Sequence, residues 1–254
     1  AVLFAVSGIA TVLILPKEPS SAEQPNQLFD RSQVLDQLRP PAHAPEFSRV
    51  FAARTCMMAG VGLTGVFLWY LVRFWVYGKA VVLTSAPLTI PAGFLIAGMA
   101  VATLIGAALA SWAAGPISER IEEKNIPVAR LVDGAFLLYA IGLGLAWGLG
   151  VWSTGTAREN GMLLFALISG FAFGIYDSLG LELVMDSLPD PRRAGHDLGI
   201  YALANSAGLA LAAIIGALLV NAFEHSFGYY LLFPSAIVMV LLAGIVTLTT
   251  KSAE

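Results

Sequence analysis

Long apolar stretches alternate with short polar ones over most of the chain. Six of the apolar stretches reach the roughly 20 residues that a helix needs to cross ~30 Å of hydrocarbon. None alternates apolar and polar residues as a transmembrane β-strand does, and backbone that faces lipid must satisfy its own hydrogen bonds. The predicted spans are residues 50–77, 88–114, 127–152, 161–187, 198–222 and 229–249. The pattern therefore predicts an all-α membrane protein with a six-helix transmembrane domain over residues 50–250.

The first 49 residues differ from the rest. Ala1–Leu15 is apolar but falls short of a bilayer at ~1.5 Å per residue, and no positive segment precedes it as in a signal peptide. We interpret this stretch as the tail of a truncated transmembrane span, which would make the chain a fragment. Residues 16–49 are polar and predict a loop, in which 30–39 is either a short surface helix or part of a disordered linker.

Lysine and arginine are distributed unevenly between the predicted loops. One set of loops holds Lys17, Arg31, Arg39, Arg49, Arg120, Lys124, Arg130, Arg192, Arg193 and Lys251. The other set holds Lys79 and Arg158, with Arg73 at the end of a span. By the positive-inside rule, the first set is cytoplasmic. We therefore expect the loops 16–49, 115–126 and 188–197 and the tail 251–254 in the cytoplasm.

Composition agrees with this class and excludes several others. The chain is 57% hydrophobic and 12% charged, with a mean hydropathy of +0.78, which is not the composition of a soluble globule. It has no basic cluster of the kind that binds nucleic acid. It also lacks G-x-x-x-x-G-K-[ST], H-E-x-x-H and any metal-spaced set of His and Cys, so we expect no cofactor, no metal site and no enzymatic activity.

Two carboxylates lie inside the predicted span 161–187. A carboxylate in hydrocarbon is costly, so Asp177 and Glu182 should face protein or water and are candidates for substrate or proton binding. Asp177 lies about three residues beyond the centre of this span. Helical spacing gives two polar stripes, one with Gly170, Gly174 and Asp177, the other with Ser178, Glu182 and Asp186. A purely structural hydrogen bond to a neighbouring helix remains the alternative for both candidates.

Other charged residues near the span ends have local explanations. Arg54 and Arg73 are close enough to the ends for their side chains to extend to the interface. Arg130 and Asp133 are spaced for an i, i+3 ion pair on one helix.

Small residues recur at helical spacing within the spans. They permit close approach of neighbouring helices, which have no hydrophobic attraction to each other inside lipid. The main examples are Gly60, Gly62, Gly65, Gly106, Ala107, Ala110, Gly144, Gly148, Gly208, Ala212 and Gly216.

The loop after the second complete span reads GPISERIEEK over residues 115–124. It resembles the cytoplasmic loop signature of the major facilitator superfamily, roughly G-x-L-x-D-R-x-G-R-K. The matching positions are Gly115, Glu119, Arg120 and Lys124. Glu119 stands where the family has Asp, and 122–123 are glutamates where it has Gly and Arg. The resemblance implies the C-terminal half of such a transporter, in which Ala1–Leu15 would end the sixth helix.

A second stretch carries a finer resemblance. Residues 188–199, LPDPRRAGHDLG, continuing to Asn205, are similar to bacterial members close to the glycoside–pentoside–hexuronide cation symporters. The resemblance implies a site at the centre of the fold, with Asn205 as a further binding residue. It also implies a cytoplasmic gate, and we assign to this gate Gly115, Glu119, Arg120, Lys124, Asp186, Asp190, Arg192 and Arg193.

The function implied by the resemblance is secondary active transport by alternating access. The expected partners are a small solute, such as a sugar or glycoside, a coupling proton or sodium ion, the lipid bilayer and the missing N-terminal half. The expected location is the bacterial plasma (inner) membrane, with the C-terminus in the cytoplasm. The alternatives are a non-transporting membrane scaffold and a solute efflux protein of the same superfamily.

Overall fold

The structure is a computed structural model, and it describes residues 45–77, 89–124, 127–152, 156–188, 194–223 and 225–249. The chain divides into two units, and all described residues belong to the second, Arg39–Glu254. The predictions for the span tail 1–15, for residues 16–44 of the first loop and for the tail 251–254 lie outside the described residues.

Every described element is a helix, as the apolar pattern predicts. In chain order these are α3 (Pro45–Gly65), α4 (Leu68–Tyr70), the π-helix η2 (Leu71–Val76), α5 (Thr89–Lys124), α6 (Val128–Trp152), α7 (Thr156–Asp186), α8 (Ala194–Ala222) and α9 (His225–Leu248).

Five of these helices are long and apolar enough to cross a membrane. They are α5 to α9, with spanning segments Ala92–Ala114, Val128–Trp152, Thr156–Met185, Asp197–Ala222 and Gly228–Leu248. The first predicted span is instead bent, because Pro45–Gly65 and Leu68–Val76 meet at 41°, the geometry of a broken span or of a re-entrant loop. Counted as a single span, this pair brings the described part of the chain to six.

The helices extend beyond several of the predicted ends. The apolar part of α5 stops at Ala114, but the helix continues to Lys124 through Pro116, so most of the predicted loop 115–126 is helical. Gly115 and Pro116 are residues that often end a helix, yet a helix can continue through them where neighbouring groups satisfy the freed backbone hydrogen bonds. Helix α3 likewise begins within the predicted loop 16–49, at Pro45. Helix α7 begins at Thr156, five residues before its predicted start at 161.

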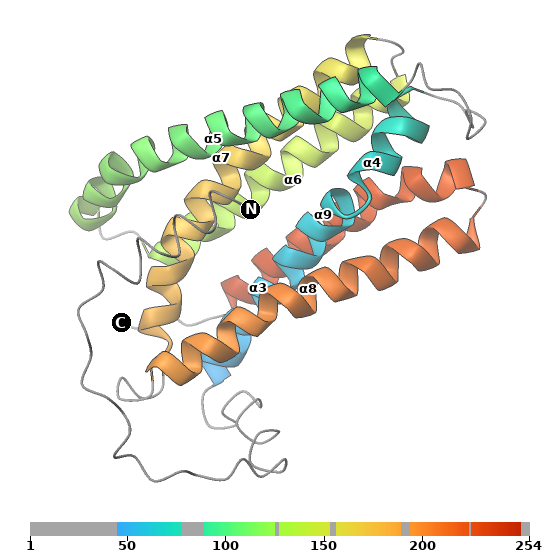
Figure 1. Cartoon of the computed structure of the whole chain (residues 1–254). Coiled ribbons are helices and arrows are strands. Elements are labelled where there is room, and N and C mark those ends of the chain that lie inside the picture. Colours follow the sequence, from blue (N-terminus) through green and yellow to red (C-terminus); the bar gives the residue numbers. More distant parts are fainter. Residues whose placement is uncertain are drawn as a thin grey trace, which may run out of the picture. The chain divides into compact units, whose positions relative to one another are not determined.

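The helices of the second unit pack in two groups. Helix α7 packs against α5 and α6, and α3 packs against α8 and α9. Helices α6 and α9 join the two groups. Figure 1 shows α5, α6 and α7 running alongside one another, apart from α3, α8 and α9.

This packing repeats within the chain. Exchanging α3 with α7, α5 with α8 and α6 with α9 turns the α5–α7 contact into α8–α3, and the α6–α7 contact into α9–α3. The α6–α9 contact maps onto itself, and the direct contact of α8 with α9 is the exception, since α5 and α6 pack together less. Two consecutive sets, α3, α5 and α6 followed by α7, α8 and α9, therefore pack in equivalent ways.

Glycines bring the helices of both equivalent crossings together. A Cβ at Gly106 of α5 would meet the carbonyl oxygen of Leu167 on α7, and one at Gly208 of α8 would lie 2.7 Å from the carbonyl oxygen of Thr55 on α3. One turn later, Ala110 contacts Gly174 and Ala212 contacts Gly62. The same Gly-x-x-x-Ala spacing thus lies at both crossings. Larger side chains at these positions would keep the helices apart.

Candidate functional site

Arg54 lies on the inner face of α3, far enough along the helix that its side chain is enclosed. It shares a helical stripe with Phe47, Val50 and Met57, and all four residues are buried. The prediction that Arg54 extends to the membrane interface is therefore wrong. Its aliphatic stem follows the apolar stripe, and the guanidinium group reaches the space between α3, α7 and α8.

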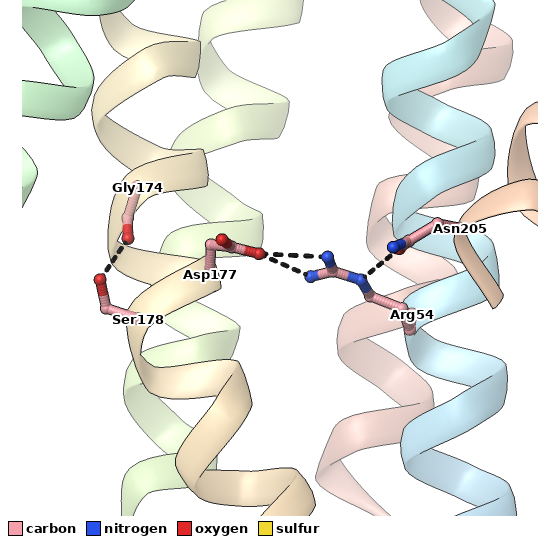
Figure 2. A network of polar contacts seen from close by, with 5 residues as sticks. All are labelled: Arg54, Gly174, Asp177, Ser178 and Asn205. Carbon is pink, nitrogen blue, oxygen red and sulfur yellow. Dashed lines mark hydrogen bonds and ion pairs between the residues drawn. The ribbon is translucent and has the colours of Figure 1, made fainter. Parts of the chain in front are cut away.

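The guanidinium group of Arg54 binds two partners on two other helices. Nε donates a hydrogen bond of 2.7 Å to Oδ1 of Asn205 on α8. Both terminal nitrogens donate to Oδ1 of Asp177 on α7, each at 3.1 Å. Figure 2 shows Arg54 bridging the gap between the two helices that carry these partners. The ion pair is a polar link between the two helix groups, which otherwise meet mainly through α6 and α9.

Two tyrosines complete the surroundings of the positive charge. Cζ of Arg54 lies 5.0 Å from the ring centroid of Tyr176 and 5.5 Å from that of Tyr201. Both distances are within the range of a cation–π interaction. The rings come from α7 and α8, each next to or one turn from a hydrogen-bonding partner of Arg54. Three helices therefore converge on one guanidinium group.

Asp177 and Asn205, two of the three predicted binding residues, belong to this cluster. In the described chain, the Asp177 side chain is 57% exposed, whereas that of Arg54 is 10% exposed. Because α7 starts earlier than predicted, Asp177 lies farther from the middle of the span Thr156–Met185 than the predicted three residues. At ~1.5 Å per residue it is roughly 10 Å from that middle, toward the end of the span at Met185.

The third predicted residue, Glu182, is not part of the cluster. It is exposed on α7, and no hydrogen bond or ion pair joins it to another residue in the part of the chain that the structure describes. Ser178, predicted on the same stripe, donates to the carbonyl oxygen of Gly174 within its own helix at 2.9 Å. The stripe that contains Glu182 therefore adds nothing to the Arg54 site.

The predicted gate residues fall largely outside the description. Gly115, Glu119, Arg120 and Lys124 lie on the C-terminal part of α5, and Asp186 ends α7, but their side chains are not described. Asp190, Arg192 and Arg193 lie outside the described residues.

Asp133 is a second unusual carboxylate, on α6. Both of its oxygens are buried and have no hydrogen-bond partner among the described residues. The predicted ion pair with Arg130 is absent, because Arg130 is exposed and no salt bridge joins the two. Instead, Oδ1 of Asp133 lies 3.8 Å from the position of a Cβ at Gly244, on α9. Asp133 is one helical turn from Arg130, but its side chain points toward α9.

Arg54 is not among the site residues predicted from the sequence, because the distance to the span end, and not the helical face, decided its interpretation. The available signal was the stripe of Phe47, Val50 and Met57, on which Arg54 occupies an apolar position. Within the described residues, no group of three or more His, Cys, Asp or Glu side chains is placed to hold a metal ion.

Comparison of the chain with protein-family models gave no match, and comparison with curated proteins gave none either.

Proposed function

We propose that this chain is the C-terminal half of a secondary active transporter of the major facilitator type. In this proposal it carries a small solute across a bacterial inner membrane by alternating access, coupled to a proton or a sodium ion. An N-terminal half of the same protein would face the Arg54 cluster and complete the site. The C-terminus would be cytoplasmic, and the chain would catalyse no chemical reaction.

The observation that carries the proposal is the ionic cluster of Arg54, Asp177 and Asn205. Three helices direct charged or polar side chains at one another, and ionisable residues inside spanning helices commonly mark solute or ion pathways. A structural scaffold has no need of such a cluster, because small residues and apolar packing suffice to hold helices together in lipid.

The internal repeat supports the same proposal. In many secondary transporters, two sets of helices with inverted topology are related by a pseudo-twofold axis, and the binding site lies where the repeats meet. Here Arg54 belongs to the first helix of one set, and Asp177 to the first helix of the other. The ion pair therefore joins equivalent helices of the two sets.

Uptake by proteoliposomes tests the proposal. The protein, together with its N-terminal half, would be reconstituted under an imposed proton or sodium gradient and supplied with labelled sugars, glycosides and sugar acids. We expect gradient-driven accumulation, and we expect Asp177→Asn to abolish accumulation while retaining exchange, since the amide cannot carry the negative charge. Glu46→Gln, the same change in the first turn of α3, is the matched control and should accumulate normally.

Two results would contradict this proposal. Uptake no faster than in empty vesicles, under either gradient and with every solute, would favour the membrane scaffold. Full accumulation by Asp177→Asn would show that Asp177 does not couple the ion gradient to transport.

A further inference from the structure

The position of the Arg54 charge is fixed independently of Asp177. Asn205 holds Nε by the shortest hydrogen bond of the cluster, at 2.7 Å, and the rings of Tyr176 and Tyr201 lie close to Cζ. Only 10% of the side chain is exposed. These contacts leave the two terminal nitrogens as the face of the guanidinium group that points away from α8 and toward α7.

Asp177 is by comparison a weakly held partner. Its Oδ1 is shared by both terminal nitrogens at 3.1 Å, whereas a strong arginine–carboxylate pair makes two parallel bonds of about 2.7–2.9 Å to two oxygens. No hydrogen bond to Oδ2 occurs among the described residues, and the side chain is 57% exposed. Asp177 can therefore leave Arg54 for water, while Asn205 and the tyrosines stay.

Whatever takes the place of Asp177 must bring a negative charge. A buried guanidinium group that loses its counter-charge is strongly destabilised, and a neutral hydroxyl supplies hydrogen bonds without compensating the charge. A guanidinium group has five N–H donors, and Asn205 and Asp177 accept three of them, so once Asp177 leaves, the terminal nitrogens can form forked bonds to an incoming oxyanion. A ligand with a single carboxylate replaces the charge of Asp177 one for one and neutralises the positive charge of Arg54.

We propose that Arg54 is a binding residue for a carboxylate on the solute and that Asp177 occupies this position only until the solute arrives. The transported compound is then a small organic acid or a sugar acid, and a neutral sugar is not its substrate. The term solute rests on the proposed transport function, but the carboxylate site on Arg54 does not.

Matched pairs of compounds test the carboxylate requirement directly. The thermal midpoint of the purified protein would be measured with D-glucuronate against D-glucose, and with lactate against 1,2-propanediol, at constant ionic strength. A ligand that binds only the folded state raises this midpoint as its concentration rises. We expect at least one acid to raise it and its neutral counterpart to leave it unchanged.

Variants connect the effect to the cluster. Arg54→Gln should abolish the shift, and Arg54→Lys, which keeps the charge without the fork, should weaken it. Arg130→Gln removes an exposed arginine from α6 and should leave the shift intact. Asp177→Asn should bind the acid more tightly, by about tenfold if Asp177 occupies Arg54 about nine-tenths of the time, because the internal competitor is gone. A residue with a purely structural role would not increase affinity when replaced.

Several outcomes would overturn the inference. They are equal shifts with the neutral compounds, no shift with either acid, a shift that survives both Arg54 variants, or weaker binding by a folded Asp177→Asn. The inference and the proposed function can fail separately. Arg54-dependent acid binding without uptake in vesicles would support the carboxylate site and contradict the transport function. Uptake restricted to neutral sugars would support the transport function and contradict the carboxylate site.

Discussion

At the scale of single residues, the two halves of the Arg54–Asp177 pair differ in how they are held. Arg54 has partners on two helices besides its own and is buried, whereas Asp177 contributes one oxygen and stays accessible. A fixed cation opposite a movable anion is an arrangement that a ligand can enter at small structural cost. The same two residues in a symmetrical, fully enclosed pair would have to separate in a low-dielectric interior, which is far more expensive.

Asp133 presents the opposite case, a buried carboxylate without a hydrogen-bond partner among the described residues. Because both of its oxygens are buried without a described partner, we expect Asp133→Ala to lose no more than about 0.5 kcal/mol of unfolding free energy and to gain up to about 1–3 kcal/mol. The loss of three side-chain atoms beside Gly244 opposes this gain. The measurement is unfolding of the purified protein in detergent by a denaturant.

Arg130→Gln serves as the companion variant for Asp133. An i, i+3 ion pair would make both substitutions destabilising and their effects non-additive, whereas an exposed Arg130 without an ion pair to Asp133 makes its replacement nearly neutral. A loss of more than about 1 kcal/mol in Asp133→Ala would mean that the carboxylate has a stabilising partner after all.

At the scale of the elements, the two glycine crossings set how closely the helices approach. A Cβ at Gly106 would overlap backbone atoms of Leu167 and Phe171, and one at Gly208 would lie 2.5 Å from the Met58 Cβ. Backbone cannot move aside as a flexible side chain can. We therefore expect Gly106→Val and Gly208→Val each to lower the thermal midpoint and to cost at least about 1–3 kcal/mol of stability.

Gly144→Val is the matched control for both crossings. Gly144 is also a helical glycine, on α6, but a Cβ there would meet no atom within 4 Å. The same gain in side-chain volume should change its stability by no more than about 0.5 kcal/mol. Equal losses in all three variants would show that backbone propensity, and not helix approach, determines the effect.

Much of the element structure could be predicted from the sequence, because hydropathy alone reports where a helix can sit in lipid. The apolar end of α5 at Ala114 was predicted correctly, but the polar continuation of this helix to Lys124 was not. Nothing in a hydropathy profile distinguishes a helix that leaves the membrane from a loop. Gly65 and Gly144 likewise have the spacing of packing glycines but no close neighbour, because spacing does not say which face meets another helix.

The candidate site was predictable in part for the same reason. Asp177 was found because a carboxylate within a span requires an explanation, and this argument needs no knowledge of neighbours. Its partner Arg54 is 123 residues away in the chain, and only the packing of α3 against α7 and α8 brings the two together. The bend after Gly65 and the π-helix η2 were also invisible to the apolar pattern, which continues unbroken through them.

At the scale of the whole described unit, the repeat of three helices explains how Arg54 and Asp177 are brought together. Helix α3 of the first set packs against α8 and α9 of the second, and α7 of the second set packs against α5 and α6 of the first. Each set therefore depends on the other for its packing. The first helices of the sets meet where Arg54 and Asp177 pair, so a movement of one helix group relative to the other would act directly on this pair.

The orientation of the bundle is the remaining property of the whole molecule, and cysteine labelling can test it. The loops predicted to be cytoplasmic include residues 188–197, in which Gly195 is described and exposed at the start of α8. Trp152, at the end of α6, is 86% exposed and belongs to the predicted outer side. In a Cys56→Ser background, which removes the single cysteine of this sequence, Gly195→Cys and Trp152→Cys would be exposed to a membrane-impermeant maleimide.

In intact cells we expect Trp152→Cys to be labelled and Gly195→Cys to be protected until the membrane is opened. The physical reason is the excess of lysine and arginine on the side of Gly195, because loops rich in positive charge are retained in the cytoplasm during insertion. Labelling of Gly195→Cys from outside, with Trp152→Cys protected, would show that the bundle has the opposite orientation in the membrane. The Arg54–Asp177 pair, which lies toward the Asp186 end of α7, would then be nearer the outer side of the membrane.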